Sequence, residues 1–477
     1  MSRPLLPLDL PRRMTASDAL FWFTESALPI FRPIIAALYL LERAPDVDRL
    51  SRGAEAAVAL VPRLRQRVRE APLGLGLPEW IDDPHMDLAY HLRHVTLPAP
   101  GTRSHLLELV AKLIATPLDR ERPLWESYWI DGLDGGRAAY LIKLHHAVVD
   151  GVGSVAILNA ITQAGPDDDV LEVRSTGRRA STAEPGVLDR VGSLVADQAR
   201  ATAELARSGI EAAGRLVREP RGALDDLAQT ARRMRGMLDD ILQPPVVDPL
   251  ARSTAGISRR LSVADVPLER LRKIKAPLGV TINDVVLTVF AGALGAYHRE
   301  HRTGVARLNC MVPMNLRSRS ERDGMGNRVG MFNVRLPIGE KRPDARLRDI
   351  VAQTRAAKDD QRGAAYPALA GVLPLLPTRA YEWFARRSLG KVNVVCTNVP
   401  GARERRYMAG APIASMYPFA SPVEGTPVIL ALLSYAGILH LGLDTDPESI
   451  PDPDHLTELI EREIVVMERL AGAASSG

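Results

Sequence analysis

The chain has 477 residues, of which 46% are hydrophobic and 25% are charged, a composition typical of an ordinary globular protein with about two or three domains. Aromatic residues make up only 5%, which argues against a surface that stacks on single-stranded nucleic acid, and the net charge of +4 is small beside 61 basic and 57 acidic residues. Cys310 and Cys396 lack metal-ligand spacing, so we expect neither a disulfide scaffold nor a zinc site, but a reduced intracellular protein.

The first predicted domain, residues 1–165, mixes helices and strands. Ser17 is expected to cap a short helix, and 34–41 is an apolar run typical of a buried strand. Apolar residues recur at three- and four-residue spacing over 48–70, which predicts a helix. A strand over 138–144 then leads into His145-His146-Ala-Val-Val-Asp150-Gly151, and a helix follows over 154–163.

Residues 166–255 form the predicted linker between two domains. A loop with three consecutive aspartates precedes a long helical segment, 186–242, in which leucines and valines lie among arginines, and Pro244-Pro245 ends it. Two interpretations stay open for this segment: a helical crossover packed on the two domains, or a helix that binds a membrane surface or a partner.

The second predicted domain, residues 256–477, again alternates helices and strands. Helices are expected over 266–275, 283–300, 347–362 and 454–470, and strands over 307–313, 327–336 and 392–396. The apolar stretch 426–443 reaches the length of a membrane span, but polar residues interrupt it, so two strands with a turn at Ala436-Gly437 fit better. Both halves therefore predict α/β or α+β layers.

The sharpest motif is the histidine pair at the end of the 138–144 strand. Gly151 allows the backbone to turn back sharply, and Asp150 can lock that turn by bonding the local backbone or an arginine. An imidazole can accept a hydroxyl proton and return it to a thiolate, so His146 is a candidate general base. A metal site fits poorly because neighbouring strand residues point to opposite faces, whereas two structurally satisfied histidines stay an open alternative.

Other motifs that could indicate a cofactor site or a nucleophile are either absent or stand in the wrong structural context. Gly151-Val-Gly153-Ser-Val-Ala156 matches the dinucleotide fingerprint, but the histidines separate it from its strand and an acidic loop follows its helix. The sequence has no G-x-S-x-G elbow and no phosphate-binding P-loop, and both cysteines lie in apolar strands as expected of inert thiols. A general base without a protein nucleophile implies direct attack by the acceptor.

Further motifs accompany the histidine pair across nearly the whole chain. In order they are Pro117-Leu-Asp119, Pro123-Leu124-Trp125-Glu126, Thr281-Ile-Asn283-Asp284, Val312-Pro313-Met-Asn-Leu-Arg317, Gly326-Asn327, Asn398-Val-Pro-Gly401 and Ser434-Tyr435-Ala-Gly437. With these motifs the chain resembles the bacterial wax ester synthase/diacylglycerol acyltransferase family, within the superfamily of chloramphenicol acetyltransferases and condensation domains. It departs from the family pattern at Ala402, where a second proline is usual.

The resemblance implies two similar chloramphenicol-acetyltransferase-like domains, each a central mixed sheet with helices, joined by a helical crossover and enclosing a tunnel. It implies transfer of a fatty acyl group from acyl-CoA, as co-substrate and without a further cofactor, to a long-chain alcohol or diacylglycerol. His146 would be the base, beside His145 and Gly151 in the catalytic motif, with Asp150 structural. Supporting or substrate-binding roles would fall to Pro123, Leu124, Trp125, Asn283, Asp284, Arg317 and Ser434.

Several of these motifs also have structural explanations. Thr281 and Asp284 match a capping box, so Asn283-Asp284 could simply start a helix, and Trp125 could be a core aromatic. We expect a buried bridge between Asp150 and Arg317 that joins the domains.

Two parts of the mechanism stay undecided from the sequence. Asn283, Ser434 and backbone amides near Gly151 are alternative donors to an oxyanion. The basic residues nearest a family motif could bind the coenzyme's phosphates or form a solvated charge run; they are Lys391, Arg403, Arg405 and Arg406.

Two rival functions are a condensation-type acyltransferase supplied by a carrier protein and a non-catalytic lipid-surface protein. The Pro-Leu-Trp and Asn-Asp motifs argue against the first, and the intact histidine pair argues against the second. Prolines interrupt the N-terminus where a signal peptide would need an apolar helix. We therefore expect a cytoplasmic protein, peripherally associated with the inner face of the membrane or with lipid droplets, and no nucleic-acid partner.

Overall fold

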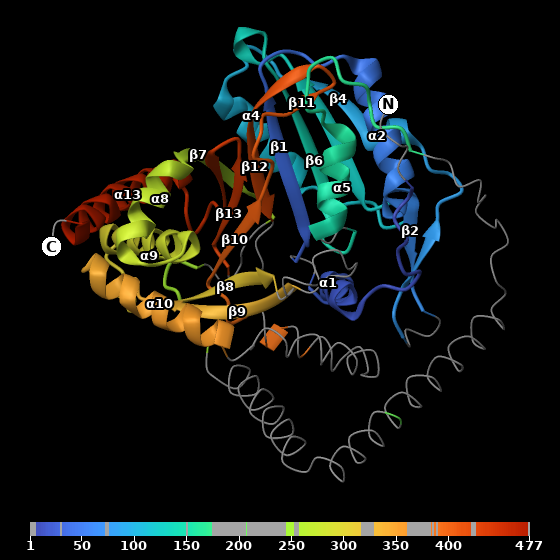
Figure 1. Ribbon diagram of the computed structural model, residues 1–477. Coiled ribbons are helices and arrows are strands. Elements are labelled where there is room, and N and C mark those ends of the chain that lie inside the picture. The colour runs from blue at the N-terminus through green and yellow to red at the C-terminus, as the bar shows by residue number, and fades with distance from the viewer. Residues whose placement is uncertain are drawn as a thin grey trace.

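The computed structural model describes most of the chain (Figure 1). The described residues are 6–28, 31–71, 76–148, 151–173, 207, 245–251, 257–315, 329–359, 383, 386–387, 390–420 and 426–475. Nearly all of the 186–242 segment lies outside the described residues, and so do Asp150 and Arg317. The predicted bridge between these two residues and the role of the segment therefore stay predictions.

The N-terminal half is built on a six-stranded mixed sheet with strand order β11-β12-β1-β6-β5-β4. The pairs β11–β12, β12–β1, β1–β6 and β6–β5 are antiparallel, and β5–β4 is parallel. The strand bounds are β1 Ile34–Leu41, β4 Leu92–Thr96, β5 Trp125–Asp131, β6 Ala138–His145, β11 Tyr407–Met408 and β12 Ala411–Ala420. Every residue of β6 is buried, as expected for a central strand covered on both faces.

Helices and a small two-stranded sheet surround this sheet. The bounds are α1 Ala16–Ala27, α2 Val47–Leu60, α3 Leu88–His91, α4 Arg103–Ala115 and α5 Gly151–Ile161, with β2 Gln66–Arg69 paired to β3 Glu79–Asp82. Side-chain oxygens of Thr15, Asp46 and Thr102 accept first-turn backbone N–H groups and so cap α1, α2 and α4. The predicted cap at Ser17 is wrong by two residues, because Thr15 holds that position.

The C-terminal half has a second six-stranded sheet, with strand order β7-β14-β13-β10-β8-β9. Its strands are β7 Arg260–Pro267, β8 Leu308–Asn315, β9 Val329–Leu336, β10 Val394–Pro400, β13 Val428–Tyr435 and β14 Ile438–Thr445. Its helices are α8 Leu268–Leu278, α9 Ile282–Glu300, α10 Pro343–Asp359 and α13 Pro453–Ser475. α8, α9 and α13 pack together over the sheet and form a second core with it (Figure 1). The predicted mixed α/β layers with one sheet per half are confirmed.

The two halves exchange a piece of chain. β11 and β12 come from the C-terminal part of the sequence, yet β12 pairs with β1 along the sheet of the N-terminal half, with Leu38 opposite Tyr417. Sequence analysis assigned no strand to 407–420 and placed all of 256–477 in the second domain, so it did not anticipate this exchange.

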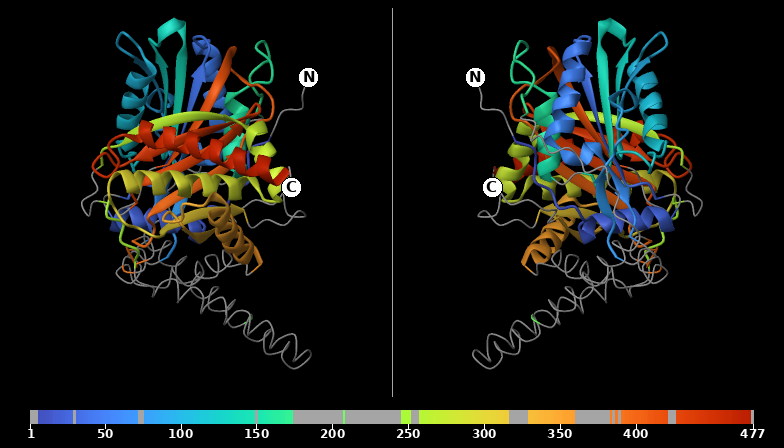
Figure 2. Two further views of the ribbon diagram at one scale, coloured as in Figure 1. Left: turned by 90° about the vertical axis from the view of Figure 1, so that its left-hand side faces the viewer. Right: turned by 90° about the vertical axis from the view of Figure 1, so that its right-hand side faces the viewer.

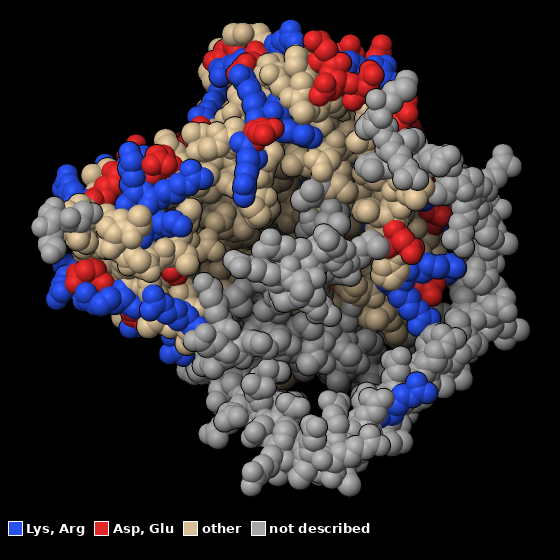
Figure 3. All heavy atoms as spheres, viewed as in Figure 1, with Lys and Arg blue, Asp and Glu red and all other residues tan. Residues whose placement is uncertain are grey.

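Polar contacts hold the halves together where β12 faces β7 and β14. The Tyr417 hydroxyl donates to Asp265 on β7 at 2.9 Å and accepts a bond from Arg103 on α4. The second oxygen of Asp265 lies 2.6 Å from His440 Nδ1 on β14. Basic side chains are frequent over the helices of the C-terminal half, and uncharged surface lines the hollow between the halves (Figure 3).

Two predicted helices have different bounds because of prolines. The helix expected over 48–70 ends at Leu60, since Pro62 disfavours helical conformation at Val61, and a 3-10 turn, Pro62–Arg65, and β2 follow. The helix expected over 266–275 begins at Leu268, because Pro267 is its N-cap and the preceding residues form β7.

The apolar stretch 426–443 forms a hairpin, as predicted. β13 and β14 pair in antiparallel register, and Ala436 and Gly437 both have positive φ angles, 47° and 85°, which suit a two-residue turn. Among the described residues no single helix is long and apolar enough to cross a membrane; α8 and α9, bent by 100°, meet the criteria of length and composition only as a pair.

Candidate functional site

The histidine pair lies where β6 leaves the sheet of the N-terminal half. β6 runs between β1 and β5, with His145 opposite Ile34 and Leu144 opposite Trp125. The backbone N–H of His145 donates to the Leu124 carbonyl at 3.0 Å, and that of His146 donates to the Pro33 carbonyl at 2.7 Å. Both neighbouring segments therefore fix the backbone that presents the two imidazoles.

His145 is held in one orientation. Its Nδ1 accepts the Ala147 backbone N–H at 3.0 Å, so the ring proton of the neutral form is on Nε2. Nε2 lies 3.6 Å from Oε2 of Glu25 on α1, and neither atom has a hydrogen-bond partner among the described residues. The side chain is 1% exposed and packs edge-on against Trp22 at 6.0 Å. His145 therefore faces the interior of the N-terminal half, against α1.

His146 is placed differently. Its ring stacks on Phe21 of α1, with centroids 4.0 Å apart and planes at 18°, and Nδ1 has no hydrogen-bond partner among the described residues. Burial, together with the charge that His145 can carry, lowers the pKa of His146 to about 4. With this pKa the ring is neutral at pH 7, which is the protonation state that a general base needs.

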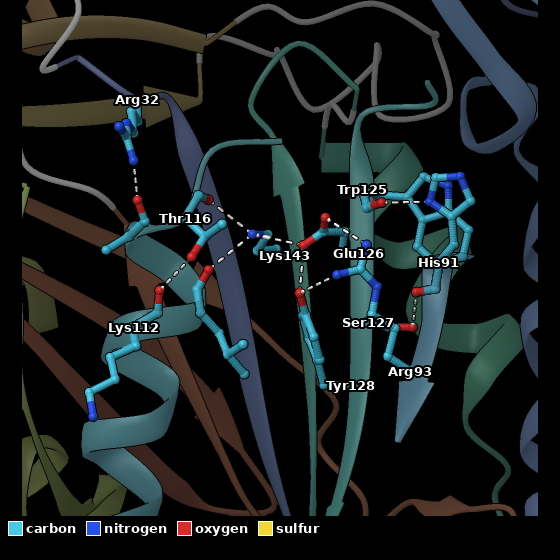
Figure 4. Close-up of polar contacts among 12 residues, drawn as sticks. Arg32, His91, Arg93, Lys112, Thr116, Trp125, Glu126, Ser127, Tyr128 and Lys143 are labelled. Atoms are coloured by element: carbon cyan, nitrogen blue, oxygen red, sulfur yellow. Dashed lines mark hydrogen bonds and ion pairs between the residues drawn. The ribbon is translucent and has the colours of Figure 1, made fainter. Parts of the chain in front are cut away.

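Trp125 supports this turn from the β5 side. Its side chain is 2% exposed, its indole N–H donates to the Leu64 carbonyl at 2.7 Å, and its ring stacks on His91 at 4.7 Å. Nδ1 of His91 also lies 2.7 Å from the Trp125 carbonyl (Figure 4). The contacts match the core-aromatic interpretation: Trp125 anchors the strand whose Leu124 carbonyl binds His145.

The adjacent Glu126 holds a buried lysine. Lys143, two residues before His145, is 0% exposed and donates to Glu126 at 2.9 Å, to the Leu113 carbonyl at 2.9 Å and to the Thr116 carbonyl at 3.0 Å (Figure 4). Burial lowers the pKa of Lys143, and Glu126 opposes this effect. Because the Tyr128 hydroxyl at 2.6 Å and Arg93 at 3.2 Å also bond Glu126, this network ties β5 and β6 to the end of α4.

A second group of predicted residues gathers in the C-terminal half. Oδ1 of Asn283 accepts a bond from Asn398 at 2.7 Å. The Gly401 backbone N–H reaches the carbonyl of Ser434 at 2.9 Å and its hydroxyl at 3.3 Å. Two family motifs, at 398–401 and 434–437, are thus brought together at the ends of β10 and β13.

Asp284 is fully engaged in structural bonds. One carboxylate oxygen accepts from the Thr281 backbone N–H at 2.9 Å and from its hydroxyl at 2.7 Å, and the other accepts from Thr354 of α10 at 2.7 Å. The Thr281 hydroxyl in turn accepts the Asp284 N–H, which completes the capping box. Asp284 therefore starts α9 and ties it to α10, as the structural explanation of this motif proposed.

The basic residues considered for phosphate binding are partly engaged elsewhere. Arg405 pairs with Glu42, and Arg406 donates to the Thr162 hydroxyl at 3.1 Å and to its carbonyl at 2.9 Å. Both residues thus join the segment before β11 to the N-terminal half.

The two cysteines lie in neighbouring strands of the second sheet, and burial raises the pKa of Cys310 well above its usual range and that of Cys396 to about 12. Both thiols are buried, as expected of core cysteines, and their lack of reactivity stays a prediction.

Sequence analysis missed Phe21, Glu25 and Lys143 as parts of the site. α1 lies far from the motif along the chain, so only the fold brings Phe21 and Glu25 to the histidines. Lys143 had a usable signal: it is the only charged residue before the histidines in an otherwise apolar strand, Ala138–His145.

Two family models match the chain. The wax ester synthase/diacylglycerol acyltransferase catalytic domain covers residues 14–286, and the C-terminal domain of the same family covers 325–468. The chain belongs to this family. Membership makes it an O-acyltransferase.

Relatives and solved structures agree with this assignment. Two Mycobacterium tuberculosis (strain ATCC 25618 / H37Rv) proteins named as probable diacylglycerol O-acyltransferases are 32% and 31% identical; one alignment covers 94% of both chains, the other 84% of this chain and 85% of the relative. The wax ester synthase/diacylglycerol acyltransferase from Marinobacter aquaeolei VT8 superposes with a TM-score of 0.63 at 24% identity, covering 96% of this chain and all of that one. The first condensation domain of the calcium-dependent antibiotic synthetase follows at 0.59, with 19% identity and 97% of both chains. These two structures show a shared fold.

Proposed function

We propose that this acyltransferase moves a fatty acyl group from acyl-CoA to the hydroxyl of diacylglycerol or a long-chain alcohol, with His146 as the general base. The observation that carries the proposal is the neutral imidazole of His146, whose Nδ1 has no hydrogen-bond partner among the described residues, at the end of the strand that presents the histidine motif. The names of the relatives, diacylglycerol O-acyltransferase and wax ester synthase, supply the two acceptor classes.

The reaction needs one proton to move twice. As the acceptor oxygen attacks the thioester carbonyl, its proton passes to a ring nitrogen of His146, and a tetrahedral oxyanion forms. The oxyanion then collapses, the carbon–sulfur bond breaks, and the imidazolium returns the proton to the leaving thiolate. The low pKa keeps the base neutral between turnovers and makes the imidazolium a strong acid toward the thiolate.

The remaining residues of the N-terminal site position this base. Bonds from His145 and His146 to the carbonyls of Leu124 and Pro33 fix the turn, and Phe21 covers one face of the reacting ring. Glu25 of α1 lies beside His145, with Oε2 3.6 Å from Nε2. Holding base and acceptor together removes much of the entropic cost of the reaction.

The donor can be tested against the rival source of the acyl group. We expect thiol release from palmitoyl-CoA to depend on an acceptor, with diacylglycerol and hexadecanol stimulating it above the rate with no acceptor. The same acyl group on a carrier protein should be a poorer donor. Thiol release that is equal with and without acceptors would contradict acyl transfer, and a preference for the carrier protein would favour the condensation-type alternative.

Because both acceptors are insoluble lipids, we also propose that the protein works from the cytoplasm at the surface of the membrane or of lipid droplets. Attachment should be peripheral and salt-sensitive, since basic residues would contact anionic headgroups. Flotation with phosphatidylserine vesicles at low and high salt tests this. Binding that salt does not weaken would contradict an electrostatic contact.

A further inference from the structure

α1 lies at the end of the N-terminal sheet where the histidine motif leaves β6, and Figure 2 shows this helix, in dark blue, at the lower end of the sheet in both views. Phe21 stacks on His146 with centroids 4.0 Å apart, and Trp22 stands edge-on to His145 at 6.0 Å. Glu25 follows Phe21 by one helical turn and lies on the same face. The helix therefore places an apolar ring against one histidine and a carboxyl group beside the other.

The carboxyl group of Glu25 is largely buried. Its side chain is 17% exposed, and Oε2 lies 3.6 Å from Nε2 of His145; neither atom has a hydrogen-bond partner among the described residues. Because Ala147 donates its backbone N–H to Nδ1 of His145, Nε2 of the neutral ring carries the proton. A donor and an acceptor that complement each other thus stand just beyond hydrogen-bond distance.

Arg120 forms an ion pair with the same carboxyl group. Its Nε lies 3.9 Å from Oε2 of Glu25, and its guanidinium covers the ring of Trp22 at 3.5 Å. Nη2 of Arg120 lies 3.8 Å from Glu70, whose side chain is 63% exposed. Two carboxylates share one guanidinium, so this group has a formal charge of minus one beside His145.

The other charged side chains around the turn have bonds of their own; they belong to Arg32, Arg93, Glu126 and Lys143. Asp150 lies outside the described residues. Within the described part of the chain, Glu25 is thus the carboxylate that stands within 4.0 Å of a ring nitrogen of the pair.

Buried polar atoms without a hydrogen bond gather at this place. Among the described residues they include Nη2 of Arg120, Oε2 of Glu25, Nε2 of His145 and Nδ1 of His146. Such atoms are rare in folded proteins, and they cluster at functional sites. A network that was fully bonded at rest would gain little when a proton arrives, whereas this one has room to respond.

We propose that Glu25 is a positioning residue of acyl transfer: through His145, its carboxylate stabilises the positive charge that the histidine pair takes up when the acceptor hydroxyl loses its proton. The inference rests on the proposed function, because it needs His146 as the base. The proton stays on His146, and Glu25 forms and breaks no covalent bond. Charge on His146 makes the neighbouring Nε2–H of His145 a stronger donor, and a movement of about 0.5 Å brings it within hydrogen-bond distance of Glu25.

The first test separates the charge of Glu25 from its shape. Glu25→Gln keeps an acceptor oxygen on a side chain of the same length but removes the charge, whereas Glu25→Asp keeps the charge on a shorter side chain. We expect kcat for transfer from palmitoyl-CoA to hexadecanol to fall about tenfold in Glu25→Gln, the equivalent of one pKa unit, and less in Glu25→Asp. KM for palmitoyl-CoA should change less than about twofold, because the charge is needed only in the transition state.

Glu121→Gln is the matched control. It makes the same chemical change next to Arg120 in the sequence, at a side chain that is 86% exposed and lies 3.6 Å from Arg67. Solvent screens a charge at such a position, so kcat should stay within about twofold of wild type.

Proton binding by the histidine pair gives a second readout, which needs no substrate. A carboxylate favours the protonated pair whichever ring holds the proton, so the midpoint of the titration followed by ¹⁵N NMR should fall by about 0.5–1 pH unit in Glu25→Gln. Arg120→Gln removes the cation beside the same carboxylate and should raise the midpoint. This variant replaces Glu25→Gln if that protein does not fold. A role of Glu25 in packing alone would leave the midpoint unchanged.

The outcomes separate this inference from the proposed function. Equal kcat and equal midpoints in wild type and Glu25→Gln would overturn the inference, and so would a Glu25→Gln protein more active than Glu25→Asp, because shape would then matter more than charge. If the wild type transfers no acyl group to any acceptor, the proposed function fails, and the midpoints still decide whether Glu25 acts on the pair. If transfer depends on His146 but not on Glu25, the proposed function stands and the role of Glu25 fails.

Discussion

The two groups of family motifs differ in how far their polar atoms are satisfied. In the C-terminal group, Asp284 accepts three bonds from Thr281 and Thr354, Asn283 is bonded by Asn398 of β10, and Ser434 by Gly401 just after β10. In the N-terminal group, Nδ1 of His146 and Nε2 of His145 have no hydrogen-bond partner among the described residues. Free polar atoms in a buried place cost stability, and they persist where a substrate supplies the partner.

The same contrast runs within the N-terminal group itself. Lys143 and Glu126 lie next to the histidines along β6 and β5, yet their bonds are complete. Closeness to the motif alone therefore does not assign a residue to the chemistry. This comparison predicts which substitutions abolish transfer and which unfold the protein.

His146→Ala should have the largest effect of these substitutions, and the effect should be on activity. We expect kcat/KM for acyl transfer to fall by a factor of about 10²–10⁴, because the proton acceptor is lost, while circular dichroism and Tm stay close to wild type. His145→Ala should cost less activity. Transfer at the wild-type rate by a folded His146→Ala protein would remove His146 from the mechanism.

Lys143→Met should act on stability instead. The change removes the buried cation of the Glu126 network and leaves the partly exposed Arg93 beside this carboxylate, which should lower the free energy of unfolding by up to roughly 3–5 kcal/mol. Urea denaturation measures it, with the exposed Lys273→Met as the matched control. If both variants unfold at the same urea concentration as wild type, the Glu126–Lys143 network does not stabilise the fold.

Asp284→Ala tests the C-terminal group. Loss of the capping box and of the bond to α10 should lower the free energy of unfolding by about 2–3 kcal/mol. Activity per folded molecule should change little. Glu269→Ala, which removes an exposed acid from the first turn of α8, is the control and should stay within about 0.5 kcal/mol of wild type. A stable Asp284→Ala protein without activity would place this residue in the chemistry.

The smallest effect concerns pH. His146 must be neutral to act, so kcat/KM should stay constant as pH falls from 7 through the ordinary histidine pKa of 6.5 and decline only toward about 4. Phe21→Ser should hydrate the ring and move this decline up toward 6.5, whereas Phe21→Leu keeps the apolar cover and should move it less. A decline of kcat/KM near pH 6.5 in the wild type would show that burial does not lower the pKa of His146.

The same pKa has a consequence for stability. Its value is lowered in the folded protein, so the unfolded chain binds a proton at higher pH than the folded chain does. The contribution of His146 to stability is therefore complete above pH 6.5 and is lost as pH falls from 6.5 to about 4. His146→Ala should weaken this dependence in a series of thermal denaturation curves.

Sequence patterns predicted those parts of the molecule that depend on neighbouring residues. The strand before His145, the capping box at Thr281 and the turn at Ala436-Gly437 are local, and all three are present in the structure. The predicted helix bounds were wrong at Pro62 and Pro267. The apolar periodicity of the sequence continues past each proline, but a regular helix cannot continue through it.

Contacts between distant segments could not be predicted in this way. The stacking of Phe21 on His146, the approach of Glu25 to His145 and the pairing of β12 with β1 all join parts of the chain whose patterns carry no record of their partners. Arg405 is an example. Its closeness to a family motif left phosphate binding and a solvated charge run as alternatives, and the fold pairs it with Glu42.

The origin of β12 also matters while the protein is being made. When β1 and β6 have left the ribosome, the strand that will pair with the free edge of β1 has not yet been translated, and the linker and most of the C-terminal half must come first. An unpaired strand edge attracts other strands, including those of neighbouring nascent chains. Synthesis therefore passes through a long interval in which the strand that carries the histidines belongs to an open sheet, and chaperones that bind exposed edges would have to protect it until residue 420 has been added.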